Sequence, residues 1–155
     1  MTVLASMLAY FQSFIPGSRL IDGGDLKTLV NTLFQTTSGI TALAGGGQTG
    51  ATQLNPGLNR VDTVASANDS VLLPYAIPGN FVVVYNNTAT DAKIYGNPAN
   101  PQNPSAASPQ GQGDTIAAST SNTQQATATG VTLANSKVSI FYCFVLGQWK
   151  QLLTA

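Results

Sequence analysis

Side chains that could catalyse a reaction or bind a metal are scarce in this sequence. It has no His, a single Cys and six Asp without any Glu. A zinc site needs several Cys or His ligands, and a Ser or Cys nucleophile is usually activated by His. A hydrolase would have to depend on Asp alone. We therefore predict no enzymatic activity, no cofactor and no metal.

The candidate reactive residues have ordinary structural explanations. Asp22 and Asp25 lie at a predicted helix start, where a carboxylate caps backbone N–H groups. Asp69 stands in a turn-like position. Cys143 lies in an apolar run, which predicts a buried, unreactive thiol. The Asn-x-Ser/Thr patterns at Asn68 and Asn86 are interpreted as accidental matches to a glycosylation sequence.

The segment Gly45-Gly46-Gly47-Gln48-Thr49-Gly50 is glycine-rich but does not resemble a phosphate-binding loop. It has no Lys-Ser or Lys-Thr after it, and no strand precedes it. We interpret it as a flexible linker.

The aromatic residues leave two interpretations open. Trp149 is the only Trp and is interpreted first as a core residue of the last hairpin. In the alternative, it stacks on a sugar together with Tyr residues on or beside strands. The residues named for that alternative are Tyr75, Tyr95 and Trp149.

The polar surface must be built largely from uncharged groups. Only 8% of residues are charged and the net charge is zero, whereas Thr, Ser, Asn and Gln occupy 53 of 155 positions. Nucleic-acid binding needs clustered cations, so we expect no nucleic-acid partner. The opening residues 1–16 lack a cationic start and are too interrupted by polar residues to cross a bilayer, so we expect no membrane association.

Residues 1–50 have helical rather than strand periodicity. Apolar residues recur at three- and four-residue intervals before Pro16-Gly17, and a second apolar stripe follows Asp25. Helices this short are marginal in water without a partner surface. We predict that this N-terminal arm is buried against another subunit or a partner surface through Val3, Leu4, Met7, Leu8, Phe11, Phe14, Ile15, Leu26, Leu29, Val30 and Leu33.

From Leu58 onward the pattern is that of short strands separated by turns. Strands are predicted over 59–65, 70–73, 81–85, 93–95, 114–116, 130–133, 138–146 and 149–153. This spacing predicts a mainly β domain over 52–155, an antiparallel β-sandwich or jelly roll, preceded by the arm with its short helices. Residues 97–113 contain four Pro and little apolar surface, which predicts a solvent-exposed insertion.

The order of several short motifs resembles a family of tailed-bacteriophage virion proteins. The resemblance covers roughly residues 18–153, and its strength lies in the order of individually weak motifs. They include Arg19-Leu20-Ile21-Asp22-Gly23, Ala44-Gly45-Gly46-Gly47-Gln48, Asp69-Ser70-Val71-Leu72-Leu73-Pro74, Val82-Val83-Val84-Tyr85-Asn86-Asn87, Gly113-Asp114-Thr115-Ile116 and Gly147-Gln148-Trp149.

This resemblance implies a capsid decoration (cement) or head-fibre-like protein. Such a protein would be expected on the outer surface of the phage head, bound to the major capsid protein and commonly present as a homotrimer. The Pro-rich insertion and residues 1–15 depart from the shared pattern. The alternative is a tail fibre or spike module that binds host carbohydrate.

Overall fold

A computed structural model describes residues 35–104 and 111–153 of the chain. The predicted arm positions from Val3 to Leu33 lie outside these residues. Within them the protein is mainly β, and no helix there is long and apolar enough to cross a membrane.

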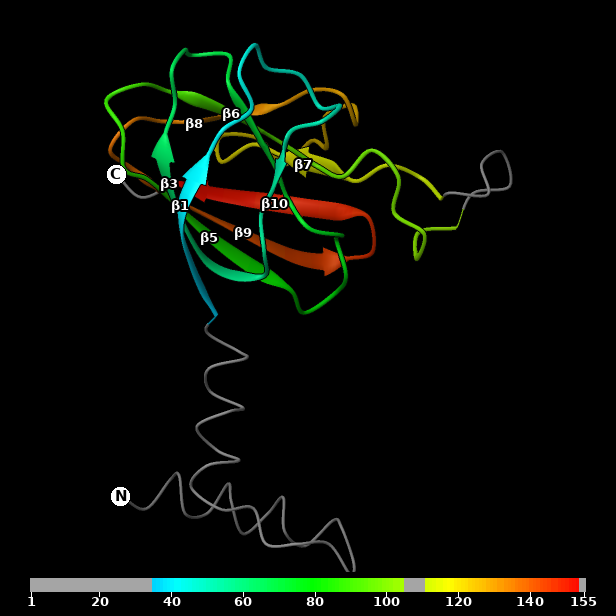
Figure 1. The fold of residues 1–155 in the computed structure, drawn as a ribbon. Coiled ribbons are helices and arrows are strands. Elements are labelled where there is room, and N and C mark those ends of the chain that lie inside the picture. The colour runs from blue at the N-terminus through cyan, green and yellow to red at the C-terminus, as the bar shows by residue number, and fades with distance from the viewer. Residues whose placement is uncertain (1–34, 105–110, 154–155) are drawn as a thin grey trace, which may run out of the picture. The chain divides into compact units, whose positions relative to one another are not determined.

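Ten strands of the described residues form two sheets, arranged as Figure 1 shows. The six-stranded sheet contains β1 (Thr36–Thr41), β3 (Gly57–Thr63), β5 (Phe81–Asn86), β9 (Val138–Val145), β10 (Gln148–Leu153) and β7 (Thr115–Ala117), in that spatial order. The four-stranded sheet contains β2 (Thr52–Gln53), β4 (Ser70–Leu72), β6 (Ala92–Tyr95) and β8 (Val131–Leu133). Each of the eight predicted strands corresponds to one of these, with small shifts at the ends.

The prediction of antiparallel pairing is wrong, because both sheets are mixed. The pairs β1–β3, β3–β5, β7–β10, β2–β4 and β4–β6 are parallel, and only β5–β9, β9–β10 and β6–β8 are antiparallel. The cause is that consecutive strands from β1 to β9 alternate between the two sheets. From β1 to β6, two successive crossings return the chain to its first direction, so next-but-one strands lie side by side and parallel.

The compact unit begins at Gln35 rather than near residue 52. Residues 36–41, which were predicted to belong to the arm, instead form β1, which pairs with β3 and places Ile40 in the core. The glycine-rich segment is an ordered turn rather than a flexible linker. Its Gly46 has a φ of +73°, and a Cβ there would lie 2.1 Å from the carbonyl oxygen of Asn68, so only glycine fits.

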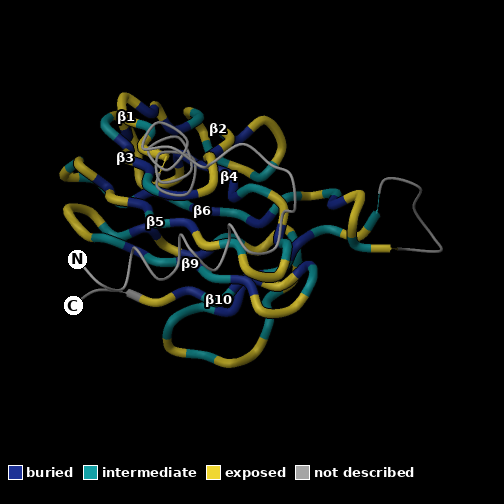
Figure 2. The backbone as a smooth tube through the Cα atoms, turned by 90° about the horizontal axis from the view of Figure 1, so that it is seen from below, coloured by how far each residue is buried: buried dark blue, intermediate teal, exposed yellow. Residues whose placement is uncertain are grey.

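Alternating side chains build one core from both sheets. Figure 2 shows the strands passing repeatedly between buried and accessible residues. In β5, Val82 and Val84 are buried between the more accessible Phe81, Val83 and Tyr85. The largest buried side chains are Trp149 and Phe141, and the cluster also includes Ile40, Leu54, Val61, Val71, Leu73, Val82, Val84, Ile94, Ile116, Val131 and Leu133.

The base of the Pro-rich insertion is structured, which corrects the prediction that residues 97–113 are simply solvent-exposed. Asn100 is fully buried and pairs with Gln112 across the two ends of the insertion. The Asp114 N–H donates to Asn97 O at 2.7 Å, which closes the base. Residues 105–110 of the insertion lie outside the described part of the chain.

Candidate interaction surface

The outward side of the six-stranded sheet carries apolar residues aligned across four strands. Strand register places Leu58 beside Val83, Val83 beside Ile140, and Ile140 beside Leu152. Leu58, Val83 and Ile140 are half-buried, and Leu152 is exposed. They form an unbroken apolar row from β3 to β10, perpendicular to the strands.

Aromatic residues extend this row on both sides. Tyr85 on β5 is next to Arg60 and Val138, and Tyr142 on β9 is next to Phe81 and Lys150. Phe144, farther along β9, is 80% exposed. We call this surface the apolar face and define it by Leu58, Phe81, Val83, Tyr85, Val138, Ile140, Tyr142, Phe144 and Leu152.

Strand β9 is apolar on both of its sides. Ser139, Phe141 and Cys143 point to the core, and Ile140, Tyr142 and Phe144 point outward. Strands with one face in water normally alternate apolar with polar residues, whereas a continuous apolar strand is typical of burial on both faces. The composition of β9 therefore indicates a strand whose outer side also meets another surface.

Charged side chains near the apolar face form an ion pair or hydrogen bonds within the chain. On β3, Arg60 forms an ion pair with Asp62 at 2.9 Å. The pKa of Asp62 is lowered, first by the hydrogen bond that the side chain of Asn87 donates at 2.8 Å and then by the backbone N–H of Gly39. On β10, the Lys150 ammonium donates to the carbonyl oxygens of Ala118 and Ser121. Arg60 is therefore neutralised by Asp62, whereas Lys150 has hydrogen-bond partners and keeps its positive charge.

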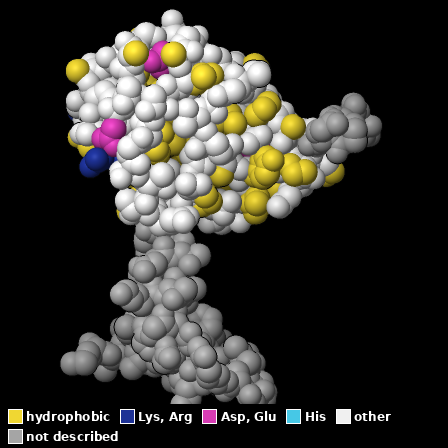
Figure 3. All heavy atoms as spheres, in the orientation of Figure 1, with side chains coloured by type: hydrophobic (Ala, Val, Ile, Leu, Met, Phe, Trp, Pro, Cys, Tyr) yellow, Lys and Arg dark blue, Asp and Glu magenta, His cyan; other side chains and the backbone are white. Residues whose placement is uncertain are grey.

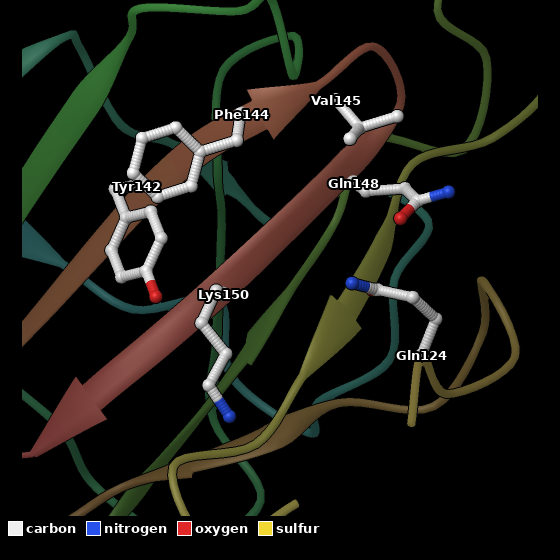
Figure 4. Close-up of a pocket in the computed structure, with 6 residues that line it drawn as sticks. All are labelled: Gln124, Tyr142, Phe144, Val145, Gln148 and Lys150. Carbon is white, nitrogen blue, oxygen red and sulfur yellow. The ribbon is translucent and has the colours of Figure 1, made fainter. Parts of the chain in front are cut away.

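A shallow hollow of about 180 Å³ lies at one end of the apolar face (Figure 4). The Tyr142 and Phe144 rings form an edge-to-face pair with centroids 4.7 Å apart. Gln124, Gln148 and Lys150 provide polar groups around them. Gln124 is held by Thr115, whose hydroxyl lies 3.0 Å from its Oε1 atom. The hollow therefore combines an accessible aromatic pair with amide groups.

Figure 3 shows hydrophobic side chains in several small groups among uncharged polar and backbone atoms on the visible face of the described residues, with few charged side chains. Exposed apolar patches of several hundred Å² often mark interaction sites on soluble proteins. The described residues contain no group of three or more His, Cys, Asp or Glu placed to hold a metal ion.

The three residues of the glycan-stacking alternative do not form one aromatic surface. Trp149 is 0% exposed and belongs to the core, so its indole has no face for a sugar, and this corrects its part in that alternative. Tyr75 is exposed in the segment between β4 and β5. Tyr95 is half-buried on β6 in the other sheet, and its ring lies close to Gly130.

Other predicted structural roles can be followed in the described residues. The Asp69 carboxylate accepts hydrogen bonds from the backbone N–H groups of Ala65 and Ser66 and from the Ser66 hydroxyl, which confirms its turn role. Cys143 is buried, which raises the pKa of its thiol. Asn86 is fully buried, and its amide nitrogen donates to Thr90 O at 2.9 Å.

Sequence reasoning did not identify the apolar face. The signal was present in the uninterrupted apolar run Ile140–Val145 and in the aromatic residues at both ends of Phe81–Tyr85. Both runs were interpreted only as strong strand signals.

Comparison with known protein families, curated proteins and solved structures finds no match for this chain.

Proposed function

We propose that this chain is a structural protein of the tailed-bacteriophage virion, a capsid decoration (cement) protein. It would bind the outer surface of the major capsid lattice as a homotrimer and stabilise the head. The apolar face on β3, β5, β9 and β10 is the observation that carries the proposal. Such a surface, on a chain with only 8% charged residues, suits a protein that works by packing against others.

The proposal assigns different contacts to the two parts of the chain. The apolar positions of the arm, from Val3 to Ile15 and from Leu26 to Leu33, would contact the capsid lattice and neighbouring subunits. Residues from Gln35 onward would form the protruding domain, with its two sheets packed as a β-sandwich. The single buried cluster drawn from both sheets supports that packing.

Binding to heads tests the decoration role. Purified full-length chain is mixed with heads that lack it, and the heads are collected by sedimentation. We expect saturable binding at a fixed ratio to the major capsid protein, and no binding to heads that already carry the full complement. Failure to sediment with deficient heads would contradict the proposal.

The hollow beside Tyr142 and Phe144 favours a second candidate function, a tail fibre or spike module that binds host carbohydrate. Aromatic rings next to amide side chains can stack on and hydrogen-bond to a sugar. A glycan array separates the two functions. Binding to a defined glycan that is lost in F144A would favour the fibre module, whereas an array without signal would favour decoration.

A further inference from the structure

We infer that the apolar face is the contact between copies of this chain, so that the faces of the subunits are buried together in the oligomer. This inference rests on the proposed homotrimer and deepens it by naming the surface that joins the subunits. In a trimer, the faces of three chains would be gathered around the threefold axis. The capsid contact would remain with other parts of the chain.

The charge distribution favours a second copy over a charged partner. The central row of Leu58, Val83, Ile140 and Leu152 contains no charge. At the margins, Arg60 is paired with Asp62, and the Lys150 ammonium is held by backbone carbonyls. A nucleic acid or a charged peptide would therefore gain little there and would lose hydration. A second copy supplies a largely apolar surface, and the zero net charge of the chain gives no long-range repulsion between copies.

The size of the face is compatible with a small specific interface. The nine outward positions, about 4.8 Å apart between strands and about 6.8 Å apart along each strand, cover roughly 300 Å² in projection. Three such faces in a trimer would bury about 900 Å², which is close to the lower limit for specific protein interfaces and predicts a contact that dissociates on dilution. The exposed aromatic residues Tyr85 and Phe144 are of the type that contributes most at the centre of such contacts.

Sedimentation velocity of the full chain with paired variants tests this inference. In the wild type we expect a species of about three times the 16.0 kDa chain mass. The variants L152E and Y85E place a carboxylate on the face at exposed positions, and their combination should give a monomer. The matched control T132E places the same charge at an exposed position on β8, in the other sheet, and should remain oligomeric. Circular dichroism and thermal melting show whether each variant is folded.

A second measurement does not depend on disrupting the contact. Single cysteines are introduced as L152C and T132C, and their labelling by a maleimide is timed, because native Cys143 is buried. We expect labelling of L152C to be at least tenfold slower than that of T132C in the oligomer, and to recover on dilution to monomer. A wild-type monomer, an oligomer that persists in the folded double variant, or equal labelling rates would each overturn the inference. Binding of that monomer to heads would leave the decoration role intact.

Discussion

The buried side chain of Asn100 donates a hydrogen bond to the buried carboxylate of Asp114 at 2.9 Å. The other carboxylate oxygen of Asp114 accepts the backbone N–H of Ala76 at 2.8 Å. Desolvation by burial raises the pKa of Asp114, and these two hydrogen bonds partly offset that effect. The pair ties the Pro-rich insertion to β7 and to the segment between β4 and β5.

Replacing Asn100 with Ala should destabilise the fold. The substitution removes a donor to a buried carboxylate, and a buried group left unsatisfied costs about 1 to 3 kcal/mol. The urea midpoint of N100A should fall with an unchanged slope. The control Q102A alters an exposed residue of the same segment and should unfold like the wild type. An unchanged midpoint in N100A would show that the pair adds nothing to stability.

Replacing only residues 105–110 of the insertion should affect stability much less than replacing the whole of 97–113. Replacing residues 105–110 with a short Gly-Ser turn should shift stability little, since halving a loop changes closure entropy by only about 0.6 kcal/mol. Replacing all of 97–113 should destabilise the protein strongly, because it removes Asn100 and the ladder to Gln112. Thermal melting of the two variants tests this prediction. Equal melting temperatures would contradict the claim that the stabilising contacts of the insertion lie outside residues 105–110.

The Asp69 carboxylate predicts a stability change in acid. Its pKa is lowered from 3.8, chiefly by the hydrogen bond from the Ser66 hydroxyl at 2.8 Å. A lowered folded-state pKa gives stability that is present above 3.8 and is lost as the pH falls through the folded-state value. D69N should therefore be less stable than the wild type at neutral pH, and the difference should narrow in acid. S66A should lie between them, and a pH-independent difference would show that the charge is unimportant.

The N-terminal arm should be needed for attachment and not for folding. Deleting residues 1–17 removes Val3, Leu4, Met7, Leu8, Phe11, Phe14 and Ile15, and each large apolar side chain buried in a contact contributes about 1.5 to 3 kcal/mol. The truncated chain should keep the β-type circular dichroism spectrum and lose binding to heads. Full-affinity binding would place the attachment elsewhere, with Leu20 to Leu33 as the leading candidate.

The strands were predictable because their alternation is local. Val82, Val84, Phe141 and Trp149 carry the periodicity of a half-buried strand or an apolar run, and each lies in a strand. Pairing direction could not be predicted, since the turn residues after Thr63 and Asn86 are the same whether the chain forms a hairpin or crosses to the other sheet. β1 was missed because Thr36–Thr41 contains only Ile40 as a core residue and a Gly, which indicates a loop.

The buried polar contacts could not be predicted from the sequence either, because they join residues that are not neighbours in the chain. Asn100 sits among Pro, Gln and Ser, and nothing in that composition shows that Asp114 will lie beside it. The apolar face could have been predicted in part, because β9 is apolar at every position from Ile140 to Val145. Its continuity across four strands depends on register, which places Leu58, Val83, Ile140 and Leu152 in one row.

The copy number of the chain in purified phage particles tests the central claim, assembly into the head, most directly. For the proposed role, heads and tails of a phage whose genome carries this sequence are separated and analysed by quantitative mass spectrometry against the major capsid protein. The decoration role predicts hundreds of copies per head, in a fixed ratio to the lattice, and none in the tail. A few copies confined to tails, or absence from the particle, would contradict it.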